Sequence, residues 1–136
     1  MKDYASVLRV TLPPNTVKTL SLAAADGRVE NVWESGEPRE GGGVHEGDGL
    51  NLLLAEGDKF LHVAHHTFAQ LRSFNGVLAE LVQHSPKMAL DIGVTMSVSA
   101  LTASLSFDAQ HLEVLSERGI TLDVSFYLAC EEDEEN

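Results

Sequence analysis

The sequence predicts an α+β fold: an antiparallel sheet of about four or five strands with two main helices packed on one face. Apolar and polar residues alternate through much of the C-terminal half, as in half-buried strands, and two further stretches repeat their apolar residues at helical spacing. The chain has 136 residues, 43% of them hydrophobic, enough for one domain with its own core. We expect a single domain over residues 1–130 and a disordered acidic tail at 131–136.

The N-terminal half begins with a predicted strand from Tyr4 to Leu12, ended by two prolines. Residues 15–25 fit either a short helix or a strand paired with residues 28–33, and the apolar spacing favours the helix. Residues 36–49 contain six of the eleven glycines and are predicted to form a mobile acidic loop.

The middle of the chain reads LNLLLA-EGD-KFLHVA, which resembles two strands joined by a three-residue turn. This pattern favours a strand at residues 58–66, with a helix as the open alternative. Thr67 and Gln70 match a capping box, so a helix is expected from Thr67 until Ser85-Pro86 stops it.

The C-terminal third predicts an antiparallel hairpin of residues 90–98 and 101–107. Asp108 then supplies the N-cap of a short helix, and Gly119 fits the left-handed position after its last turn. Alternation resumes over residues 120–128, which predicts a final strand.

The formal net charge of −12 is concentrated in two segments. Residues 26–58 carry a net charge of −7 and residues 131–135 add −5. Such a surface repels phosphate backbones and anionic lipids, so we expect no binding to nucleic acid or membranes and favour a basic protein partner. The single cysteine excludes an internal disulfide and leaves the compartment open. With no signal-peptide pattern and no apolar run of about 20 residues, a cytoplasmic protein is the default expectation.

The candidate partner-binding residues surround the single tryptophan. Tryptophan and arginine often carry the binding energy of protein interfaces, and here carboxylates flank them. Another hypothesis is that the ring pins the loop onto the sheet. The predicted set is Trp33, Glu34, Glu37, Arg39, Glu40, Glu46 and Asp48.

A metal site at His62, His65 and His66 is the alternative chemistry. In a helix, His62 and His66 would lie one turn apart and could chelate zinc. In a strand they would lie about 13 Å apart, too far for one ion. The favoured strand therefore argues against metal, and neither catalytic residues nor cofactors are predicted.

Two stretches resemble a family of short, uncharacterised bacterial domains of unknown function. VWESGEPRE at 32–40 is similar to its Trp-x-x-Gly-x-Pro segment, and LTASLSFDAQHLEVLSERGITLDVSFY at 101–127 is similar to its closing strand, helix and strand. This chain has Leu50 where the family often carries a second tryptophan. The resemblance implies an α+β fold, a bacterial source and no reaction, and some members belong to toxin–immunity settings.

The leading functional hypothesis is a non-enzymatic protein-interaction module, in one form an immunity-type neutraliser of a basic partner. A metal-binding sensor or metal-dependent enzyme that uses the three histidines is the first alternative. A structural homo-oligomer, joined through an exposed sheet edge, is the second.

Overall fold

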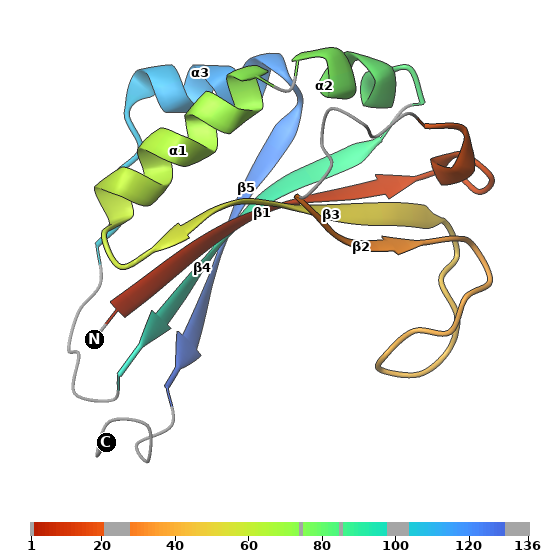
Figure 1. Ribbon diagram of the computed structural model, residues 1–136, viewed down its shortest axis with the longest axis horizontal. Coiled ribbons are helices and arrows are strands. Elements are labelled where there is room, and N and C mark those ends of the chain that lie inside the picture. Colours follow the sequence, from red (N-terminus) through yellow and green to blue (C-terminus); the bar gives the residue numbers. More distant parts are fainter. Residues whose placement is uncertain (1, 21–27, 74, 85, 98–103, 130–136) are drawn as a thin grey trace.

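The computed structural model of the protein describes residues 2–20, 28–73, 75–84, 86–97 and 104–129. Five strands form one sheet, and helices are stacked against it (Figure 1). In chain order the elements are β1 (Lys2–Leu12), the 3-10 turn η1 (Val17–Thr19), β2 (Val29–Trp33), β3 (Asp48–Gly57), α1 (Phe60–Ser73), α2 (Asn75–Val82), β4 (Lys87–Met96), α3 (Ala109–Glu117) and β5 (Ile120–Leu128).

The sheet has the order β2-β3-β1-β4-β5, with β1 at its centre. All neighbouring strands run antiparallel except β4 and β5, which are parallel and are joined by a connection that contains α3. The predicted α+β class and strand number are confirmed, whereas the sheet is mixed rather than wholly antiparallel. The predicted hairpin of 90–98 and 101–107 is wrong in its described part, since residues 104–107 form no strand; residues 98–103 lie outside the described residues.

The core lies between the sheet and its helices. Alternate residues of β1 and β4 point to this side, as in Leu8, Val10, Leu90 and Ile92, and are almost completely buried. The helices contribute large side chains to the same cluster, among them Phe68, Leu71, Leu81 and Leu115. None of the helices in the described ranges is long and apolar enough to cross a membrane.

Helix α1 corrects the prediction of a strand at residues 58–66, because Asp58 forms a bend and the helix begins at Phe60. Val63, Ala64, Phe68 and Leu71 are buried along one side, and this helical spacing outweighs the short alternation that the sequence suggested. Thr67 is not an N-cap but lies buried in mid-helix. Its Oγ1 donates to the carbonyl oxygen of Val63 at 2.6 Å and lies 2.6 Å from Oγ of Ser6 in β1.

The remaining local predictions have mixed outcomes. The backbone N–H of His111 donates to Asp108 Oδ1 at 2.8 Å, and Gly119 has φ of +65°, so both ends of α3 are as predicted. In place of the helix favoured for 15–25, the described part contains only the three-residue turn η1, and residues 21–25 lie outside the described residues.

Candidate functional site

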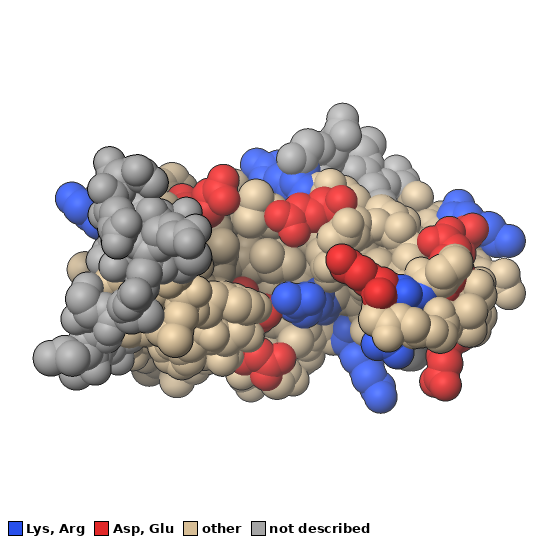
Figure 2. Space-filling model, turned by 90° about the horizontal axis from the view of Figure 1, so that it is seen from below, with Lys and Arg blue, Asp and Glu red and all other residues tan. Residues whose placement is uncertain are grey.

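The second face of the sheet, here called the open face, carries no helix of the described chain (Figure 1). Its centre holds an ion pair, in which Arg9 Nη2 lies 2.9 Å from Asp91 Oδ2. Ser125 Oγ donates to Asp91 Oδ1 at 3.0 Å, so the nearly buried carboxylate is held from β1 and β5. Figure 2 views the molecule from the side of this face and shows acidic side chains spread across it with basic ones between them.

A hairpin extension, residues 34–47, projects beyond the sheet on the side away from the helices (Figure 1). The backbone N–H of Gly36 donates to the carbonyl oxygen of His45 at 2.8 Å, and that of His45 donates to Glu37 at 2.9 Å. Pro38 and Val44 form an isolated bridge nearer the tip. The segment predicted as a glycine-rich loop therefore folds back on itself, with Gly42 and Gly43 at positive φ in its turn.

Trp33 joins the hairpin extension to the sheet. Its ring stacks on the imidazole of His45, with centroids 4.9 Å apart and planes inclined by 22°. Under the ring lies Gly49 of β3, and a Cβ at this position would overlap Cζ2 and Cε2 of Trp33. The ring packs on the sheet, as the pinning hypothesis expects, and it is partly exposed, while its role in a protein interface stays a prediction.

Asp48 has a different position from the one predicted, because its carboxylate is completely buried and cannot face a partner. Oδ2 accepts hydrogen bonds from the backbone N–H of Thr16 at 2.7 Å and of Val17 at 2.8 Å. Oδ1 accepts from the backbone N–H of Ser35 at 2.8 Å. Burial alone would raise the pKa of Asp48, but the backbone donors outweigh it and hold the pKa below its usual value.

The residues around Trp33 enclose a hollow of about 510 Å³, called the tryptophan hollow. Of the predicted set, Glu37, Arg39 and Glu40 line it together with Trp33, whereas Glu34 and Glu46 are exposed outside it. Sequence reasoning missed Asn51, whose buried Oδ1 has no hydrogen-bond partner among the described residues, and Arg9. Both lie at alternate positions of strands β3 and β1, which is the only sequence signal that could have placed them on this face.

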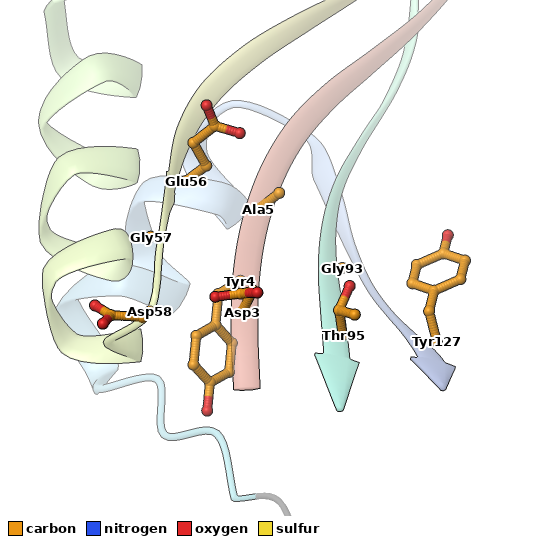
Figure 3. A pocket seen from close by; sticks show the side chains of 9 residues that line it. All are labelled: Asp3, Tyr4, Ala5, Glu56, Gly57, Asp58, Gly93, Thr95 and Tyr127. Carbon is orange, nitrogen blue, oxygen red and sulfur yellow. The ribbon is translucent and has the colours of Figure 1, made fainter. Parts of the chain in front are cut away.

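A second hollow of about 470 Å³, the acidic hollow, lies at the other end of β1 (Figure 3). It is lined by the carboxylate residues Asp3, Glu56 and Asp58, with Tyr127 across the sheet from them. The sequence placed Glu56 and Asp58 in a turn but gave no sign that they meet Asp3, more than fifty residues away. Carboxylates beside an aromatic ring can bind the cationic side chains of lysine or arginine.

The three histidines are exposed on α1. Because this segment is helical, His62 and His66 stand four residues apart on one face, and the rings of His65 and His66 are 6.0 Å apart. No group of three or more histidine, cysteine, aspartate or glutamate residues in the described parts of the chain could hold a metal ion. His62 and His66 thus form the helical pair that the metal hypothesis needs, but the described residues provide no third ligand for it.

The candidate site is therefore the open face, with the tryptophan hollow at one end and the acidic hollow at the other. Asp3 and Arg9, which line different hollows, are six residues apart in β1, or about 20 Å. Comparisons with protein-family models, with curated proteins and with solved structures found no match.

Replacing Gly49 by alanine should displace Trp33, because the new methyl group needs the space that the indole ring fills and would lie 2.8 Å from the carbonyl oxygen of Val10. We expect a red shift of the emission of this single tryptophan and a loss of about 1–3 kcal/mol in the free energy of unfolding. Gly41→Ala is the matched control, since a Cβ there meets nothing within 4 Å. An unchanged Gly49→Ala spectrum would contradict the packing described.

Asp48→Asn should destabilise the fold at neutral pH by about 1–3 kcal/mol, because an amide NH₂ would replace one accepting oxygen and face backbone donors. The folded-state pKa of Asp48 is lowered, so the carboxylate stabilises fully above its unfolded pKa, about 3.9. That contribution is lost as the pH falls through the folded pKa. Urea unfolding at pH 7, 5 and 3 should show that the stability difference between wild type and Asp48→Asn narrows only at the lowest pH. The control Glu34→Gln, at an exposed residue, should show little difference from wild type at any pH.

Proposed function

We propose that the protein is a non-enzymatic interaction module that binds a basic protein partner on its open face. The observation that carries the proposal is the pair of carboxylate-lined hollows on a sheet face that no described helix covers. A sheet with helices on one face only usually has a polar second face in contact with water. Hollows with aromatic walls add concave sites in which a side chain of a partner can bind.

The acidic hollow supplies the electrostatic part of this recognition. The hollow of about 470 Å³ has room for a lysine or arginine side chain, and Asp3, Glu56 and Asp58 are among the residues that line it. The formal net charge of −12 would attract a basic protein from a distance and speed its association.

The tryptophan hollow supplies the shape-dependent part. Trp33 and His45 form a stacked aromatic pair beside Arg39 and Glu37, and the hairpin extension raises this wall above the sheet. Large, preorganised aromatic side chains contribute contact area at a low cost in conformational entropy. A partner that spans both hollows would be recognised by its charge at the acidic hollow and by its shape at the tryptophan hollow.

The narrower form of the proposal is an immunity-type neutraliser, in which the basic partner is a toxin whose active surface the open face covers. It is supported by the resemblance to domains that occur in toxin–immunity settings and by the strongly acidic composition.

Neutralising the acidic hollow should weaken partner binding without unfolding the chain. The full-length protein is immobilised, and the proteins that it captures are identified by mass spectrometry. The captured protein that binds most tightly is purified and titrated against the wild type and the double variant Asp3→Asn/Glu56→Gln. We expect a basic partner whose affinity for the wild type falls with added salt. The affinity should be about 2- to 30-fold lower for this double variant, since each exposed ion pair contributes about 0.2–1 kcal/mol.

The matched control is the double variant Glu113→Gln/Glu117→Gln, which removes two negative charges from helix α3. It should bind the partner with the affinity of the wild type. Trp33→Ala tests the other hollow and should also weaken binding. Equal affinities for the two charge variants, or an affinity that does not change with salt, would refute the proposal.

A further inference from the structure

The two edges of the sheet are built differently. β2 is five residues long, carries exposed Glu30 at its second position, and has a register irregularity between Val29 and Asn31. Short strands, bulges and charges are the usual means of protecting an edge from further pairing. β5 is nine residues long, contains neither glycine nor proline, and keeps an unbroken register with β4 from Met88–Ile120 to Met96–Leu128. Asp123 is its only charged residue.

The β5 edge also exposes a row of apolar side chains. Val124, Phe126 and Leu128 are 37%, 59% and 72% exposed, although they pair with the buried or half-buried Ile92, Val94 and Met96 of β4. The row thus continues the core side of the sheet to its border. No described residue pairs with the outer backbone groups of β5, which ends the strand order. A long, regular and apolar edge of this kind is a site for adding a strand.

We propose that β5 pairs with β5 of a second copy of this chain, antiparallel and about a two-fold axis through Val124. In this register Val124 faces its own counterpart and Leu122 faces Phe126 of the second copy. On the other face Asp123 lies opposite Ser125 and not opposite another aspartate. The apolar residues of one β5 therefore face the apolar residues of the other β5 in antiparallel order, and no two like charges lie opposite each other.

A second copy fits this edge better than an unrelated strand for two reasons. The antiparallel two-fold arrangement uses the same nine residues from both chains and closes after two copies, which leaves no β5 edge exposed. It also joins the sheets with both helix layers on one side and both open faces on the other. The surface assigned to partner binding stays accessible in the dimer, so the two proposals stand or fall separately.

The dimer also provides cover for the exposed apolar row. The register sets Leu128 opposite Ile120 of the second copy, at the start of its β5. Helix α3 packs against β5 and places Val114 and Leu115 in the same core cluster as Ile120. The α3 layer of one copy would therefore lie close to Phe126 and Leu128 of the other and remove part of their surface from water.

Sedimentation velocity of the full chain tests the association. We expect a species of twice the monomer mass of 14.7 kDa. Val124→Lys sets two lysines against each other at the axis and should halve the mass, with an unchanged circular dichroism spectrum. Val82→Lys, a matched change at a residue 54% exposed on α2, should remain dimeric. A wild-type monomer at every concentration, or a Val124→Lys variant that is still dimeric, would overturn the proposal.

A cross-linking experiment tests the register and does not depend on the lysine variant folding. In a Cys130→Ser background, Val124→Cys should form an intermolecular disulfide, because facing residues of antiparallel strands have Cβ atoms about 4.5–5.5 Å apart. Leu128→Cys should not cross-link, since the two copies of this residue would be about 26 Å apart. Cross-linking at residue 128 and not at 124, or equally at both, would contradict the two-fold pairing.

Discussion

The helices of the described chain pack on one face of the sheet, and most other features follow from this one-sided cover. Strand side chains alternate, so each strand of the sheet's centre must divide its residues between a buried row and an open row. Leu8 and Val10 of β1 enter the core, while Arg9 between them reaches the open face. There the alternate residues form polar pairs and hollows instead of a second core. The same geometry leaves the apolar row of β5 exposed where the helix layer ends.

Asp48 fixes the position of the candidate site relative to this sheet. Removing a carboxylate from water is costly unless hydrogen bonds compensate it, and here backbone N–H groups do so. These donors come from the turn after β1 and from Ser35 at the base of the hairpin extension, so one side chain joins segments that are distant in sequence. Its neighbour Gly49 provides the flat surface on which Trp33 lies. The tryptophan hollow therefore depends on two adjacent residues of β3 that are themselves out of reach of a partner.

The sequence was informative where the determining interactions are local. Asp108 and Gly119 mark the ends of α3 because a cap and a left-handed residue act within one helical turn. It misled at residues 58–66, where a short alternation and a capping-box match at Thr67 competed with helical spacing; burial of Val63 and Phe68 against the sheet decides for the helix. The parallel pairing of β4 with β5 could not be predicted, because only the tertiary arrangement decides which strands become neighbours. The same holds for Asp48, whose partners Val17 and Ser35 lie 31 and 13 residues away.

Tyr127 connects the two surfaces to which we assign roles. Its ring lies beside Gly93, 3.4 Å from the position of a Cβ there, and forms one wall of the acidic hollow. It is also a β5 residue, and pairing about Val124 would set Thr121 of a second copy opposite it. Dimerisation would then bring two acidic hollows onto the same face of one continuous sheet. A partner with two basic segments could occupy both, and the second contact would form at the high effective concentration set by the first. Pairing of the β5 edges would thus raise the affinity of the proposed partner-binding face.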